Sequence, residues 1–263
     1  MRKSLLLLFL SGFLLLVVVG AVSAQRSARD TTVYLPIAAR APAPSCQIPG
    51  TSYTTLPISG APTGIPAATH PDLNLAIRGY VPVNAPLELV NYAGNSDPKA
   101  PQLATLFAPE RLPIFSRAYQ VYKWDWTCNC RGELNSRWPT TLLGMRVHPG
   151  EVIHVPDSGY DIGGGYDVLV LYATERRITL KYTREDNVVY GYTVHVENVC
   201  VEPDLLALYR QQNAAGRRQL PALRGNQPFA RARGYEIKVA IRDSGTFLDP
   251  RSQKDWWQDY PLP

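Results

Sequence analysis

The sequence predicts a mainly β fold, an antiparallel sheet or sandwich with at least one helix. Residues 177–183 and 235–242 alternate between apolar and polar side chains, as strands with one buried face do. Residues 167–173 form a short continuous apolar run, which is typical of a fully buried strand. The clearest helix signal covers residues 204–215, with a proline at its start and a glycine just past its end.

Short stretches in the first half of the chain are also expected to be strands, and Pro, Gly or Asn bounds the first two of them. These stretches are residues 73–80, 87–92, 118–126 and 142–147. The third carries aromatic side chains on both faces, and the fourth is followed by a predicted turn at His148.

The second half of the chain contains a predicted hairpin and a predicted final strand. A polar turn at residues 184–187 separates the strands 177–183 and 189–196, which should therefore pair. Its two adjacent carboxylates, Glu185 and Asp186, are expected to be solvated. In the final strand, alternation predicts a core face of Ile237, Val239 and Ile241 and an opposite face of Glu236, Lys238 and Arg242.

The N-terminus predicts export. Residues 1–24 have a short basic start, a long apolar run and small residues before the expected cleavage after Ala24, as in a secretory signal peptide. The alternative is a membrane anchor that is retained. Residues 25–66 are rich in Pro, Ala, Ser and Thr and predict a spacer. Residues 67–263 then form the predicted mainly β extracytoplasmic domain.

The charge of the chain bears on its partners. The formal net charge is +5 and the basic residues are scattered, which argues against nucleic acid as a partner. An exported, weakly basic protein is instead attracted to anionic wall polymers or lipid head groups. Contact with the membrane is expected only through the signal segment, if it is not cleaved.

The four cysteines are expected to form two disulfides, because the count is even and the protein is predicted to be exported. A bond between Cys128 and Cys130 would close a strained small ring. We therefore expect each of these to bond a distant partner, one to Cys46 and the other to Cys200. The alternative is a four-thiolate zinc site, whose usual C-x2-4-C pairs the chain lacks.

Four stretches carry a resemblance to a known family. Residues 167–173 are similar to its central strand, and residues 192–196 to its Tyr-x-His-Leu strand with one extra residue before the histidine. Residues 223–234 look like its Gly-Gln-x-Ile-Gly turn, and residues 236–250 follow its final strand, small turn and Asp-Pro. In this order they resemble the C-terminal half of lysostaphin-like (LytM-type) zinc metallopeptidases.

The resemblance implies a zinc site that this sequence does not reproduce. In that family a His and an Asp from upstream and the second His of a final H-x-H hold the metal. The two H-x-H positions are Glu236 and Lys238 here, and a protonated lysine cannot bind zinc. Upstream, His70 is the nearest candidate ligand, but the family's His-x3-Asp spacing is absent because Asn74 stands in the place of the Asp. Only His195, on the Tyr-x-His strand, corresponds to an active-site histidine. We therefore expect no metal, no cofactor and no metallopeptidase activity.

Other candidate binding residues lie outside the two positions that correspond to H-x-H. Asp157 and Asp161 flank a glycine-rich stretch that could contact a ligand or a hard cation. Trp124 and Trp126 are expected on one strand face, where they could stack on sugar rings or pack in the core.

The functional prediction is an exported binding or accessory protein of the cell envelope. Its lysostaphin-like domain would be non-catalytic, and its ligand would be peptidoglycan, another cell-wall polymer or another envelope glycan. The alternative is an envelope hydrolase, a peptidase or a glycan hydrolase, with an unrecognised site around His195, Glu236 and Asp157.

Overall fold

The computed structural model describes residues 45–262 and confirms a mainly β fold with antiparallel sheets. The strands are β1 Thr54–Pro57, β2 Tyr80–Val83, β3 Phe115–Asp125, β4 Cys130–Leu134, β5 Leu142–Arg146, β6 Val152–His154, β7 Val168–Thr174, β8 Arg177–Lys181, β9 Tyr192–Glu197, β10 Val199–Val201, β11 Gln219–Leu223, β12 Pro228–Ala232, β13 Glu236–Asp243 and β14 Thr246–Leu248. The helices are α1 Leu75–Arg78, α2 Pro203–Ala214 and α3 Gln253–Trp256, with 3-10 turns at Ala67–Thr69 and Leu103–Leu106.

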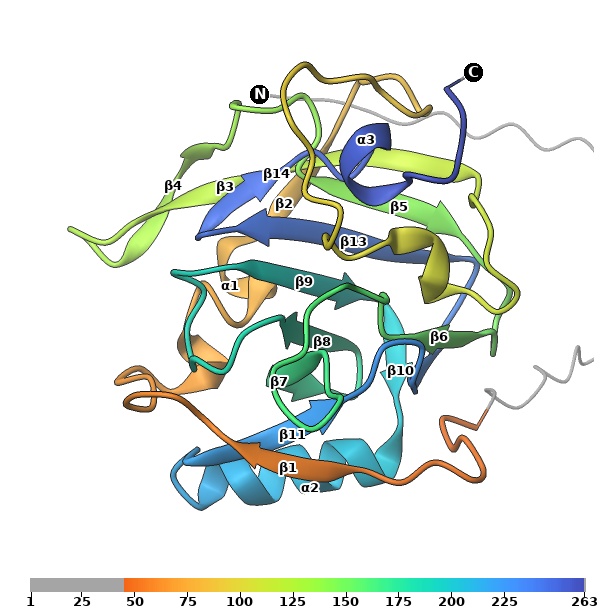
Figure 1. Ribbon diagram of the computed structural model, residues 1–263. Coiled ribbons are helices and arrows are strands. Elements are labelled where there is room, and N and C mark those ends of the chain that lie inside the picture. The colour runs from red at the N-terminus through yellow and green to blue at the C-terminus, as the bar shows by residue number, and fades with distance from the viewer. Residues whose placement is uncertain (1–44, 263) are drawn as a thin grey trace, which may run out of the picture. The chain divides into compact units, whose positions relative to one another are not determined.

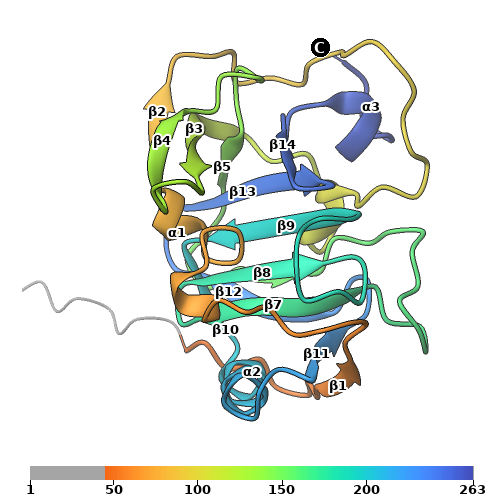
Figure 2. The same cartoon turned by 90° about the vertical axis from the view of Figure 1, so that its left-hand side faces the viewer.

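Two sheets enclose the core. The large sheet has the order β1-β11-β7-β8-β9-β13-β5-β3-β2, with β14 beside β13 and β4 beside β3 (Figure 1). Strands β10 and β12 of the small sheet, β10-β12-β6, lie next to the large sheet (Figure 2). Apolar side chains of both sheets belong to one continuous core. Helix α2 lies against β7 and β11 at one end of the large sheet.

Most elements of the second half of the chain are confirmed. The helix expected at residues 204–215 is α2, and its N-terminus is capped by the carboxylate of Glu202. The apolar run at 167–173 is β7, which is buried along most of its length. The expected hairpin is formed by β8 and β9, which pair antiparallel, although β9 begins only at Tyr192.

Two expected strands of the first half are wrong. Within residues 73–80, Leu75–Arg78 form the short helix α1, and Tyr80 already belongs to β2. The helix begins after Asn74, whose side chain accepts from the amide of Ala76. It ends at Gly79, where φ is 71°, a value that glycine adopts readily. Residues 87–92 make only an isolated bridge, from Val90 to Ser252. Their alternation is local, and among residues 45–262 no strand pairs with them to complete a ladder.

The two faces of β13 are as predicted. Ile237, Val239 and Ile241 are fully buried in the main core. Glu236, Lys238 and Arg242 lie on the opposite face, which is not simply solvated. A second apolar cluster partly covers that face and consists of Leu75, Tyr119, Val121, Leu142, Ala240 and Phe247.

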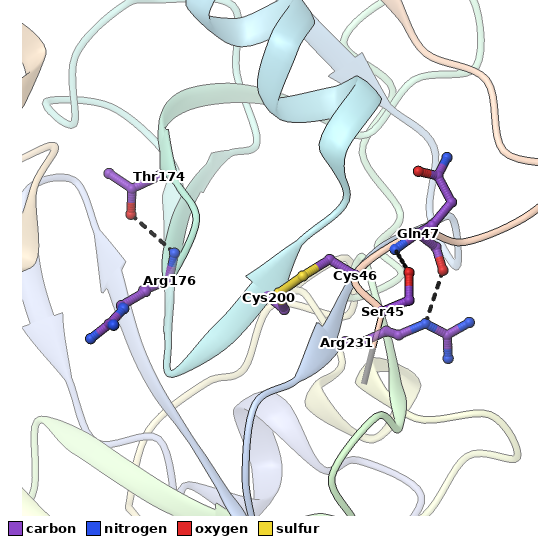
Figure 3. The surroundings of a disulfide bond; sticks show 7 residues. All are labelled: Ser45, Cys46, Gln47, Thr174, Arg176, Cys200 and Arg231. Carbon is purple, nitrogen blue, oxygen red and sulfur yellow. Dashed lines mark hydrogen bonds between the residues drawn. A yellow bond between two sulfur atoms is a disulfide. The ribbon is translucent and has the colours of Figure 1, made fainter. Parts of the chain in front are cut away.

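The predicted disulfide pairing is wrong. Cys46 bonds Cys200 and Cys128 bonds Cys130, with Cα–Cα distances of 5.4 and 5.2 Å. The β3–β4 hairpin turns at Asn129, whose φ is 50°, and this turn brings Cys128 and Cys130 together. Cys46 lies beside β10, and Arg231 of β12 also holds this segment through the carbonyl of Gln47 (Figure 3).

The predicted signal peptide and residues 25–44 of the predicted spacer lie outside the described residues. The rest of that spacer contributes to the domain, because β1 pairs with β11 and Ile48 is buried. Within residues 45–262, no helix has the length and apolar character needed to cross a membrane.

Candidate functional site

The large sheet carries a row of polar side chains on the face opposite the main core. Antiparallel pairing places Arg177 of β8 opposite Glu197 of β9, and Glu197 opposite Lys238 of β13. One edge of this row continues to β5, where Arg146 lies opposite Glu236. Strands β8, β9, β13 and β5 are neighbours in the sheet. The polar side chains that they carry, from Arg146 in β5 to Lys238 in β13, therefore lie on one surface.

The carboxylate of Glu236 is held by two side chains of β3 and one of its own strand, β13. Ser116 Oγ and Tyr119 Oη of β3 donate to its two oxygens, the second at 3.2 Å, and Lys238 Nζ lies 3.9 Å away. A Cβ on Gly144 of β5 would lie 2.6 Å from Glu236 Oε2. The absence of a side chain at Gly144 therefore makes room for this carboxylate.

The ammonium group of Lys238 lies against two tyrosine rings. Its Nζ is 5.0 Å from the ring centroid of Tyr80 and 4.8 Å from that of Tyr119, distances at which a cation is attracted to a ring face. Burial raises the pKa of both phenols to about 12, so both are neutral at physiological pH.

The residues present do not fit the zinc ion that the resemblance implies. Lys238 places a cation where the metal charge would be, and cation–π contacts with Tyr80 and Tyr119 hold it there. Across residues 45–262, no three His, Cys, Asp or Glu side chains lie close enough together to hold a metal ion.

His195 is on the same face but is only 1% exposed. Thr179 Oγ1 donates to the carbonyl of Leu73, so it accepts a hydrogen bond from His195 Nδ1, at 3.0 Å. Burial, with a further contribution from Arg242, holds the pKa of His195 well below its usual range. The imidazole is therefore neutral, stacked against Phe247, and positioned within the fold rather than in a cleft.

The segment at His70 lies over this face, as the resemblance implies for upstream ligands, but it makes ion pairs. Asp72 Oδ1 accepts from Arg78 and, at 2.9 Å, from Arg242 of β13. Burial opposes its charge, but Arg242 and Arg78 outweigh that effect and lower the pKa of Asp72 to about 2. Asn74, the position where an aspartate would be required, caps α1 instead.

A groove of about 660 Å³ opens beside Glu236. Two exposed apolar side chains are at this groove, Ile114 at 67% and Tyr235 at 75% exposure. Arg146 and His148, both exposed, provide hydrogen-bond donors, whereas Arg111 is paired with Glu151. The lining residues are Arg111, Ile114, Ser116, Arg146, Val147, His148, Glu151, Tyr235 and Glu236. A hollow of about 570 Å³ near residues 48–54 contains none of the predicted site residues.

The other predicted site residues are elsewhere. Asp161 accepts from the amides of Gly163 and Gly165 and so closes its own loop. Asp157 lies beside Asp167 and Gly225, at the loop that precedes β12. The structure therefore does not bring Asp157 together with His195 and Glu236.

Trp124 and Trp126 mark the far end of the β3–β4 hairpin. Trp124 is half-buried and donates to Asn129, whereas Trp126 lies past the end of β3, is 51% exposed and contacts the ring of His70. Trp124 follows Tyr119 by five residues along β3, which is about 16 Å of strand, and neither tryptophan lines the groove beside Glu236. Both indoles are therefore outside the groove.

Sequence reasoning missed the groups that hold Glu236. Ser116, Tyr119 and Gly144 come from strands that are distant in the chain, and no local pattern marks them. Tyr235 is the first residue of the alternating stretch 235–242, so its position next to Glu236 was the one available signal.

No family model, curated protein or solved structure matches this chain. The four stretches that resemble lysostaphin-like metallopeptidases contain β7, β9, β11 in part, β12, β13 and β14. Two of these strands, β9 and β13, carry His195, Glu236 and Lys238.

Glu197 makes the polar face sensitive to pH. It is 3% exposed, and burial raises the pKa of its carboxyl from 4.5 to about 7, although Arg177 at 3.1 Å opposes this. A raised carboxyl pKa means that the folded protein favours the protonated form. Protonation of Glu197 therefore adds to the free energy of unfolding. This contribution is fully present below about pH 4.5 and is lost as the pH rises through about 7.

We expect the free energy of unfolding of the native protein, relative to Glu197→Gln, to decrease between pH 4.5 and pH 7. Urea unfolding at a series of pH values measures this difference. Glu133→Gln, which removes an exposed glutamate paired with Lys123, is the control and should show no such decrease. A difference for Glu197→Gln that is constant over this window would contradict the assignment.

Proposed function

We propose that this protein is an exported binding or accessory module of the cell envelope and that it holds an envelope glycan, such as peptidoglycan, in the groove beside Glu236. The observation that carries the proposal is the groove itself, where an exposed aromatic ring adjoins a carboxylate fixed by two hydrogen-bond donors. In this proposal the domain is a lysostaphin-like module without metallopeptidase chemistry.

The chemistry of the groove is compatible with a sugar chain. Tyr235 offers a flat, largely exposed ring on which the apolar face of a sugar can stack, and Ile114 extends this apolar surface. Glu236 remains 26% exposed at its side chain and can accept from sugar hydroxyls. A ligand would therefore meet apolar and polar groups that are already in place.

The charges of the groove favour a ligand with carboxylate groups. Arg111 is neutralised by Glu151, but Arg146 has no ion-pair partner among residues 45–262. A guanidinium group binds carboxylates with two parallel hydrogen bonds. The free carboxylates of the stem peptides of peptidoglycan have this chemistry, so we favour peptidoglycan over a neutral polysaccharide.

Lys238 supports binding rather than hydrolysis. It holds a positive charge in the place where the related enzymes would hold zinc, and it stabilises Glu236 and Glu197 in a fixed arrangement. His195, the other residue of the resemblance, has no access to a ligand because it is 1% exposed.

Sedimentation of the mature protein with purified peptidoglycan sacculi tests the proposal. Tyr235→Ala and Arg146→Ala should each weaken binding about tenfold, because central aromatic and arginine contacts commonly contribute this much. Tyr190→Ala is the matched control, since Tyr190 is 65% exposed but lies in the β8–β9 connection, and it should bind normally.

Two results would contradict the proposal. Equal binding by Tyr235→Ala, Arg146→Ala and the native protein would show that the groove is not the site. Release of soluble fragments from the sacculi, abolished by a chelator and accompanied by stoichiometric zinc, would show a hydrolase instead.

A further inference from the structure

The tip of the β3–β4 hairpin carries an exposed disulfide. Cys128 and Cys130 are bonded across a single residue, and both are exposed at the end of a hairpin that projects beyond the sheet (Figure 1). The bond of Cys46 to Cys200 differs in both respects, because those cysteines are half-buried and 154 residues apart.

A disulfide of this kind is open to exchange. Two cysteines separated by one residue close a small ring, which is unfavourable for the preferred disulfide geometry. Exposed or strained disulfides are the ones that thiols attack and reduce most readily. The sequence separation and the exposure therefore both point to a labile bond.

The hairpin does not need this bond to keep its shape. Backbone pairing places Asp125 opposite Cys130 and Trp124 opposite Arg131, so the ladder reaches the last residue before the turn. Within the turn, Asp125 Oδ1 accepts from the amide of Thr127 at 2.8 Å, and Asn129 Oδ1 accepts from the Trp124 indole at 3.3 Å. A dithiol form can thus keep the same tip conformation.

An exposed indole adjoins the bond. Trp126 is 51% exposed and precedes Cys128 by two residues, so it offers apolar contact area next to the sulfur atoms. Apolar side chains near the cysteines of another polypeptide could pack here during exchange.

We propose that Cys128 and Cys130 form a redox site that transfers its disulfide to a pair of reduced cysteines in another polypeptide. A thiolate of the partner attacks one sulfur of the Cys128–Cys130 bond, which breaks and leaves a mixed disulfide and one thiolate. The partner's second thiolate then attacks the mixed disulfide. The partner loses two electrons and two protons and gains a disulfide, and Cys128 and Cys130 become a dithiol. A low-molecular-mass disulfide such as oxidised glutathione restores the bond by the same exchange.

The first experiment compares the two disulfides within the full mature chain. The protein is equilibrated with increasing dithiothreitol, free thiols are trapped with a maleimide, and the labelled peptides are mapped by mass spectrometry. We expect Cys128 and Cys130 to be half-reduced at a dithiothreitol concentration at least about tenfold lower than Cys46 and Cys200, with unchanged circular dichroism. Opening of both bonds together, or of Cys46–Cys200 first, would overturn the proposal.

The second experiment measures transfer to a synthetic peptide with two reduced cysteines, in the presence of oxidised glutathione. The native protein should oxidise the peptide at least about tenfold faster than glutathione disulfide alone. Cys130→Ser and Cys128→Ser should abolish this acceleration, and at least one of them should accumulate the mixed disulfide.

Trp126→Ala, which leaves both cysteines in place, should slow transfer and leave the reduction midpoint unchanged. Acceleration that persists in the Cys128→Ser/Cys130→Ser double variant would refute the assignment.

Discussion

Arg217→Ala is expected to lower the free energy of unfolding by about 3–5 kcal/mol, because it leaves a buried carboxylate without its counter-ion. Asp186 is 1% exposed, and its two oxygens accept from Arg217 Nε at 2.8 Å and Nη2 at 2.6 Å. Arg217 is itself 6% exposed and also donates to the carbonyl of Leu171 in β7. The pair therefore connects the β8–β9 connection to the end of α2 and to the sheet.

Urea unfolding followed by circular dichroism measures this effect. Arg210→Ala is the matched control, because Arg210 forms an ion pair with Glu175 in which both side chains are more than half exposed. Such exposed pairs contribute about 0.2–1 kcal/mol. If Arg217→Ala destabilised the protein no more than Arg210→Ala, water or another group would have to replace the lost contact, and Asp186 would not be buried as described.

Replacing Cys46 and Cys200 by serine is expected to cost about 2–5 kcal/mol of the free energy of unfolding. The bond joins residues 154 apart, and closing a long loop removes more freedom from the unfolded chain than closing a short one. It also holds the segment before β1 against β10, so its loss should expose residues 45–52 to proteases (Figure 3).

The Cys128→Ser/Cys130→Ser variant is the control for this prediction. The disulfide that it removes closes a ring with a single intervening residue. The same loop-closure argument therefore predicts a loss of only about 1–2 kcal/mol of the free energy of unfolding. Equal losses for the two double variants in urea unfolding would show that loop length does not govern the stabilisation here.

Part of the candidate site follows from the sequence. Alternation along β13 places Glu236 and Lys238 on the face opposite Ile237 and Val239, since successive side chains of a strand point to opposite sides. The groups that hold Glu236 could not be found in this way. Ser116 and Gly144 reach it only because β5 pairs with both β3 and β13, and sheet order is not encoded in any local pattern.

The charged residues show the same division. The sequence places Asp186 in a polar turn and suggests a solvated side chain, whereas the fold buries it against Arg217, which is 31 residues away. The sequence also suggests that Cys128 and Cys130 avoid each other, but the turn at Asn129 brings them together. Both errors arise because an argument from neighbours in the chain cannot foresee which distant group fills the space.

The sequence by itself determined the β class, the buried strand β7, the helix α2 and the two faces of β13. Each of these depends on the period of apolar side chains or on residues at helix ends, and these act over a few positions. Only the tertiary structure decided the disulfide pairing, the change of residues 75–78 from strand to helix and the polar contacts of Glu236, Asp72 and Asp186. These depend on contacts between segments tens of residues apart, which form only when the sheet order is set and the core is packed.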